Sequence, residues 1–166
     1  MVDMSRKRLS KIVGLFLAGQ RDRKAKLFEK DFALMVKRDN YRLAEAKRIV
    51  KSGQLKNGKE FYCAAMIFHH SGKLSDTKIA LRLVNGSMER NYKPAKWLFA
   101  AVTDRILTQQ GLKQKFGTQF QRNIKTGRWK LFPIDPKTTD SERIEFNVPT
   151  LKEIKAKLVS LNKKTL

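Results

Sequence analysis

Residues 96–107 read KWLFAAVTDRIL, and this stretch decides the fold. On a helical wheel of 3.6 residues per turn its apolar side chains cover almost every direction, a pattern typical of a helix at the centre of a protein. Pro94 stands where the first turn of a helix tolerates proline, and Gly111 follows the last apolar residue. We therefore predict a central helix over residues 94–110.

This helix carries two charges where the pattern predicts burial. Asp104 shares a side with Trp97 and Ala101, and Arg105 lies near Leu98. A buried charge without partners costs several kcal/mol, so both side chains must be hydrogen-bonded or paired. They either anchor a neighbouring loop or belong to a functional site, and the pattern leaves both interpretations open.

A second apolar stretch, FYCAAMIFHH at residues 61–70, ends in two histidines. On a helix, adjacent residues point about 100° apart, so His69 and His70 cannot easily face one ligand. The chain holds two histidines and one cysteine, and we predict neither a metal site nor a cofactor. A histidine at a helix C-terminus is favoured by the helix dipole, whereas a role in proton transfer is the alternative.

The remaining sequence extends this helical pattern outward. We predict a mainly α-helical fold, a single compact multi-helix domain over residues 1–166 with a small β-hairpin near the C-terminal third. Its parts are a basic amphipathic N-terminal helix (1–20), a helical body (21–112), a turn and hairpin (113–135) and C-terminal helices (136–166). Further helices are predicted over residues 22–37, 40–51, 60–70, 74–90, 139–146 and 149–161, and strands over 118–124 and 128–134.

Positive charge dominates the composition. Lys and Arg number 37 against 15 Asp and Glu, a formal net charge of +22. The net charge is +10 over residues 1–60, +4 over 61–110 and +8 over 111–166, so the two ends carry most of it. Such a charge implies a polyanionic partner: nucleic acid, with RNA favoured over DNA, an acidic membrane surface or an acidic protein.

Basic side chains cluster in the N-terminal part and in the hairpin. No known RNA- or DNA-binding motif accompanies them, so we expect recognition of backbone and shape rather than sequence. In the hairpin, Trp129 and Phe132 are interpreted as core residues, with stacking on a base as the alternative. The residues expected to contact nucleic acid are Arg6, Lys7, Arg8, Lys11, Arg21, Arg23, Lys24, Lys26, Arg122, Lys125, Arg128 and Lys130.

The sequence also bears on location. No apolar run approaches the ~18 residues that a membrane span needs. The single cysteine, Cys63, lies within an apolar run, which favours a reducing compartment. We expect a cytoplasmic protein; the basic N-terminus makes an organellar matrix the alternative.

Three segments together resemble a widespread, mainly bacterial family of small proteins catalogued as a domain of unknown function. They are residues 61–70, residues 95–107 with the Asp104-Arg105 pair, and GLKQKFGTQ at residues 111–119. The chain departs from the family pattern at His69, Ser71 and Phe116, where the family has glutamine, glycine and tyrosine. The resemblance implies a fold and a candidate site rather than an activity.

The polar residues of these segments form the candidate site. If they converge, His70 serves as a general base oriented by Asp104, while Arg105 and Gln119 bind an anionic or carbonyl group. The rival interpretation is a buried polar network that holds the hairpin against the helices. The full set of candidate catalytic residues is His70, Asp104, Arg105, Gln114, Thr118 and Gln119.

The function that the sequence favours is binding of structured RNA through its phosphate backbone, within a ribonucleoprotein particle. One alternative is a small hydrolase or transferase acting on an anionic substrate at the candidate site. Another is an interaction module for an acidic protein. Charge and composition do not decide whether the protein is an enzyme.

Overall fold

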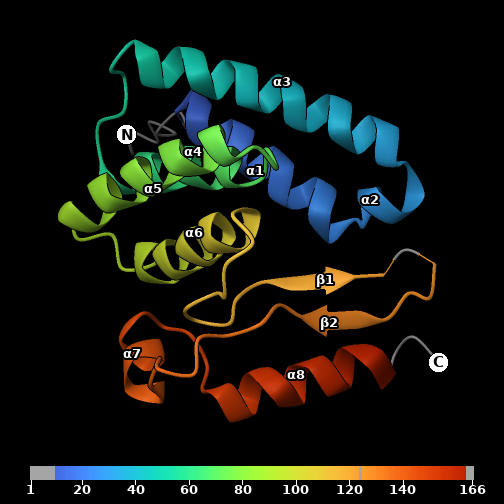
Figure 1. Cartoon of the computed structure of the whole chain (residues 1–166). Helices are drawn as coiled ribbons and strands as arrows, with labels where there is room; N and C mark the ends of the chain where they lie inside the picture. The colour runs from blue at the N-terminus through green and yellow to red at the C-terminus, as the bar shows by residue number, and fades with distance from the viewer. Residues whose placement is uncertain (1–9, 124, 164–166) are drawn as a thin grey trace, which may run out of the picture.

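The computed structural model describes residues 10–123 and 125–163, and within them the chain forms eight helices and one two-stranded sheet (Figure 1). The elements are α1 (Lys11–Lys24), α2 (Leu27–Lys30), α3 (Phe32–Lys51), α4 (Gly58–His69), α5 (Leu74–Glu89), α6 (Ala95–Gln109), β1 (Phe120–Arg122), β2 (Trp129–Leu131), α7 (Asp140–Glu145) and α8 (Leu151–Lys163).

Helix α4 lies at the centre of the helical body. It contacts α1, α3, α5 and α6, and its residues 63–69 are all buried, as expected of a helix that is apolar nearly all round. Its start approaches the end of α5 closely: a Cβ on Gly58 would lie 2.7 Å from Tyr92 Cβ and 3.1 Å from the Ser87 carbonyl oxygen. The Ser87 hydroxyl donates to the Gly58 carbonyl oxygen at 2.6 Å. Gly58 therefore permits a contact that no larger residue fits.

Helix α6 joins the two hydrophobic clusters of the protein. Leu98 and Val102 pack into the main core with α4 and α5, whereas Ala100 belongs to a smaller cluster with Phe116 and Ile154. In Figure 1, α6 lies between the helical body and the hairpin. The prediction of a central helix is confirmed, and its observed bounds differ by one residue at each end.

The C-terminal part packs the hairpin between α6 and α8. Strands β1 and β2 are antiparallel, with Phe120 opposite Leu131. The side-chain amide of Asn162 on α8 accepts from the Trp129 backbone N–H at 2.8 Å and donates to the Trp129 carbonyl oxygen at 3.0 Å. Gly117 precedes the hairpin and has a φ of +93°. A Cβ added at Gly117 would lie 2.9 Å from Ile154 Cδ1 on α8. Both contacts fix the hairpin against α8.

The mainly helical class, the single compact domain and the hairpin near the C-terminal third are confirmed. The helix boundary predicted at residues 37–40 is wrong. The chain instead breaks at Lys26, which has φ +54°, and α3 begins after Asp31, whose carboxylate accepts from the Leu34 N–H at 2.9 Å. Asn40 continues the helix because a mid-helix asparagine costs well under about 1 kcal/mol. Likewise, α1 runs beyond the predicted end at residue 20, and residues 1–9 of that prediction lie outside the described part.

The sequence predicted neither a membrane span nor a metal site. No helix within residues 10–123 and 125–163 has the length and hydropathy needed to cross a membrane. Over the same ranges, no cluster of His, Cys, Asp and Glu side chains could hold a metal ion. The Cys63 thiol is buried, and burial raises its pKa to about 12, so it is a packing residue.

Candidate functional site

Asp104 is the anchor of the segment that leads from α6 into the hairpin. Its carboxylate is fully buried and accepts four hydrogen bonds. The backbone N–H groups of Lys115 and Phe116 donate to Oδ1 at 2.7 and 2.8 Å. The N–H and hydroxyl of Thr118 donate to Oδ2, both at 2.8 Å. A carboxylate that accepts several backbone N–H groups fixes a loop in one conformation, because each group would otherwise be left unsatisfied.

Two glutamines extend this network. The Gln114 side chain donates to the carbonyl oxygens of Gln119 at 3.1 Å and Phe132 at 2.9 Å, and accepts from the Gln119 N–H at 2.8 Å. The Gln119 amide donates to the Ala101 carbonyl oxygen and to Thr118 Oγ1, at 3.1 and 3.0 Å. The network therefore ties the turn, both ends of the hairpin and α6 together.

Arg105 stands at the edge of the network, half-buried. Its Nε donates to Gln119 Oε1 and its Nη1 to the His69 carbonyl oxygen, each at 3.1 Å. Within residues 10–123 and 125–163, no carboxylate lies within 4.0 Å of its guanidinium. Burial, followed by the nearby Arg23, lowers the pKa of Arg105. In the described part of the chain, the Arg105 guanidinium therefore hydrogen-bonds to neutral acceptors alone.

The two histidines at the end of α4 are held uncharged. His69 is buried, and burial, then Arg105 and Arg23, lowers its pKa from 6.5 to about 3. Burial and then Arg23 also lower the pKa of His70 well below 6.5. Among the described residues, His69 Nδ1 and His70 Nε2 are buried nitrogens without a hydrogen-bond partner. Neither histidine bonds to Asp104, whose four donors come from the turn.

A groove of about 600 Å³ opens beside His70 and Arg105. It lies between α2, α3 and β2, and its size falls within the ~300–1,000 Å³ typical of small-ligand sites. Its polar lining includes those two residues, Arg23 and Asp39. Its apolar lining includes three aromatic rings, those of Phe28, Phe32 and Trp129.

An arginine–aspartate cluster lies behind this groove. Arg42 bridges Asp22 and Asp39 with distances of 2.6 and 2.7 Å, Arg23 lies 3.0 Å from Asp39, and Arg38 lies 2.7 Å from Asp22. Burial raises the pKa of Asp22, but the hydrogen bonds from Arg42 and Arg38 outweigh it, so the net shift is downward. The three guanidiniums of this cluster exceed its two carboxylates, which leaves it positive.

The structure separates the predicted catalytic residues into two groups. Asp104, Gln114, Thr118, Gln119 and Arg105 form one connected network, as the rival interpretation of a structural network describes. His70 lies in the groove beside Arg105 instead. The proposed orientation of His70 by Asp104 has no hydrogen bond to support it.

The predicted nucleic-acid contacts are distributed unevenly. Arg6, Lys7 and Arg8 lie outside the described residues. Lys11 forms an ion pair with Glu45, and Arg23 pairs with Asp39. The others are exposed, at the end of α1 and in the turn that follows it (Arg21, Lys24 and Lys26) and along the hairpin (Arg122, Lys125, Arg128 and Lys130).

The sequence analysis predicted one helix over residues 22–37, which contains Phe28 and Phe32, and did not identify the place of these two rings at the groove. Their exposed fractions are 42% and 70%. The available signal was the surrounding sequence, in which charged residues flank both rings within the break between α1 and α3. Trp129, interpreted as a core residue, is half-buried and lines the groove.

Comparison of the chain with protein-family models, with curated proteins and with solved structures gives no match. The resemblance to the bacterial family therefore stays a prediction.

Proposed function

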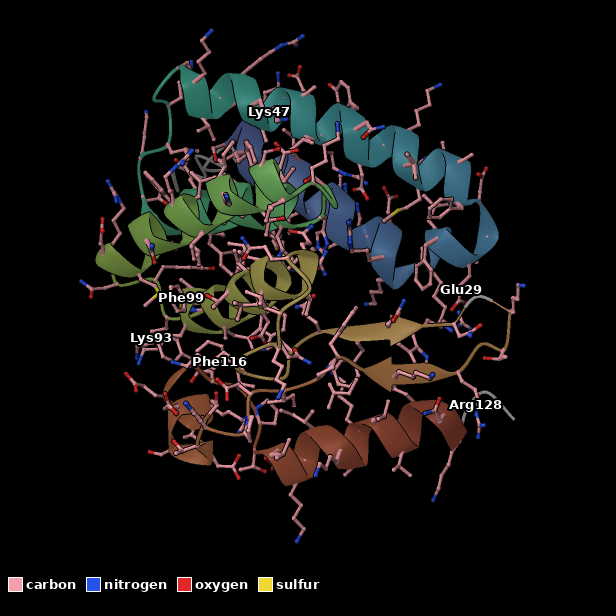
Figure 2. All side chains as sticks on the ribbon, viewed as in Figure 1. Glu29, Lys47, Lys93, Phe99, Phe116 and Arg128 are labelled. Carbon is pink, nitrogen blue, oxygen red and sulfur yellow. The ribbon has the colours of Figure 1, made fainter. Side chains whose placement is uncertain are left out.

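We propose that this protein binds structured RNA through its phosphate backbone, as a cytoplasmic component of a ribonucleoprotein particle. The observation that carries the proposal is the meeting of two basic segments that lie about a hundred residues apart in the chain. Arg122 on β1 lies 3.7 Å from Glu29 on α2, and Lys26 lies 3.7 Å from the same carboxylate. In Figure 2, Glu29 and Arg128 lie at the same end of the molecule.

Charge at this end favours a polyanion. We define the basic end by Arg21, Lys24, Lys26, Arg122, Lys125, Arg128 and Lys130, all of which are exposed. Glu29 is the carboxylate that approaches two of them, and a single carboxylate neutralises one charge of the seven. Exposed lysines and arginines contact phosphates without reading bases, which suits recognition of shape.

A salt series distinguishes RNA from an acidic protein as the partner. The measurement is fluorescence anisotropy with a labelled RNA hairpin, a DNA duplex of the same sequence and a polyglutamate peptide. Between about 50 and 200 mM salt we expect RNA affinity to fall by a factor of about 10³ if roughly six phosphates are contacted. We expect DNA to bind more weakly than RNA. Failure of RNA to bind at the lowest salt would show that the proposal is wrong.

Charge reversal at the basic end tests where the RNA binds. The variant K26E/K125E/R128E removes three predicted phosphate contacts, so we expect the slope of log affinity against log salt to shrink by about three. The matched control is K73E/K78E/K93E, which lowers the net charge equally. Its three lysines are exposed, and Figure 2 places Lys93 at the end opposite Arg128. Equal slopes in the two variants would mean that overall charge, rather than the basic end, governs binding.

A further inference from the structure

The groove between α2, α3 and β2 adjoins the basic end but has a different chemistry. It is a cavity whose lining includes two arginines, Arg105 and Arg23, and three aromatic rings. The basic end, by contrast, consists of exposed flexible side chains. The groove is therefore suited to a ligand that is anionic at one point and flat and apolar at another.

The positive charge in the groove exceeds the negative charge. Arg105 contacts neutral acceptors only, among the described residues. Asp39 pairs with Arg23 at 3.0 Å but also accepts from Arg42 at 2.7 Å, so its charge is shared. A half-buried guanidinium without a carboxylate is stabilised by any anion that enters. This favours a phosphate, which takes two parallel hydrogen bonds from arginine.

The aromatic rings are exposed to an unusual degree for their size. Phe32 is 70% exposed and Phe28 42% exposed, and neither belongs to a hydrophobic core cluster. Trp129 lines the same groove from the opposite element, β2. Aromatic rings beside arginines are the usual means by which proteins hold unstacked bases of RNA.

We propose that the groove binds one unpaired RNA nucleotide, with its phosphate against Arg105 and its base among the rings of Phe28, Phe32 and Trp129. The proposal rests on the proposed function, because the basic end holds the rest of the RNA. It adds a preference that backbone contacts alone cannot supply: RNA that presents an unpaired nucleotide is favoured over a continuous helix.

The first test compares two RNA hairpins that differ by one bulged nucleotide in the stem. Stacking of one base contributes a factor of about five to affinity at the lower end of measured effects and more than about a hundred at the upper end. We expect the full-length protein to bind the bulged hairpin about tenfold more tightly. F32A should abolish the preference and change affinity for the fully paired hairpin by less than about twofold. The matched control is Y41A, since Tyr41 on the same helix is 61% exposed but lies outside the groove.

The second test measures nucleotide binding in the groove through the fluorescence of Trp129. The chain has two tryptophans, so W97F leaves Trp129 as the sole indole. In this background we expect uridine monophosphate to quench the fluorescence of Trp129 and uridine alone to do so far more weakly. Replacing Arg105 with lysine, which keeps the charge but loses the guanidinium fork, should weaken the nucleotide effect, with the unfolding midpoint measured in parallel.

The outcomes separate the two proposals. If both hairpins bind equally, or if F32A weakens both to the same extent, the groove proposal is overturned and the proposed function stands. If neither RNA binds, both fail. Tighter binding of the polyglutamate peptide that is lost in F32A would assign the groove to an acidic protein instead.

Discussion

Acidification from pH 7 to pH 5 is expected to lower the free energy of unfolding by about 2 kcal/mol through His69, with a further loss through His70. His69 has a folded-state pKa of about 3 and an ordinary value of 6.5, and His70 shifts in the same direction. Below pH 6.5 these two histidines bind protons in the unfolded chain but stay neutral in the folded protein. The free energy of unfolding therefore falls as the pH falls through that value. Well below pH 6.5, His69 contributes about 1.4 kcal/mol per pH unit to this loss, and His70 adds to it in the same direction.

The measurement is urea unfolding, followed by circular dichroism, at pH 7, 6 and 5. H69Q should remove about 2 kcal/mol of the loss and H70Q a further part of it, because each substitution removes one titrating group. Asp22 and Glu142 are carboxylates whose pKa values are lowered in the folded protein. The stabilisation that they contribute is lost only below about pH 4.5, outside this window. If the double variant H69Q/H70Q loses as much free energy of unfolding on acidification as the unsubstituted protein, other groups cause the acid sensitivity.

The substitution D104N is expected to lower the free energy of unfolding by about 3–5 kcal/mol. An asparagine oxygen can still accept from Lys115 and Phe116, but its NH₂ group would then face the N–H of Thr118. That donor would lose its acceptor, and four hydrogen bonds to a carboxylate would become at most three to a neutral amide, the third from the NH₂ group to the Thr118 hydroxyl oxygen.

The matched control for D104N is D31N, the same change at an exposed helix cap. Asparagine and aspartate cap helices about equally well, so a difference of less than about 0.5 kcal/mol is expected. Urea unfolding at pH 7 measures both. A loss at Asp104 no larger than that at Asp31 would contradict its role as the anchor of the turn.

The sequence predicted the elements whose ends carry strong local signals. The bounds predicted for α4, α5 and α6 agree with the observed bounds to within two residues, and Pro94 and Gly111 flank the ends of α6. The boundary between α1 and α3 was missed because nothing in the local sequence shows that Lys26 adopts a left-handed conformation. Propensity alone placed the break at Asn40, and packing of a long α3 against α1 and α4 overrides so small a preference.

The candidate site was predictable in part, for a physical reason. Burial of Asp104 and Arg105 followed from helical periodicity, and so did their need for partners. Which partners they find depends on how the turn at residues 113–119 folds back, and periodicity carries no information about that. The groove was missed because its rings come from two segments that are distant in the chain.

The double hydrogen bond between Asn162 and Trp129 has a consequence for association between copies of this chain. A two-stranded sheet exposes backbone donors and acceptors along its outer edge, and such edges recruit strands from other molecules. At Trp129, the amide of Asn162 occupies both groups as a neighbouring strand would. A single side chain on the last helix thereby shields the sheet from aggregation at this point, in a protein whose charge already keeps its copies apart.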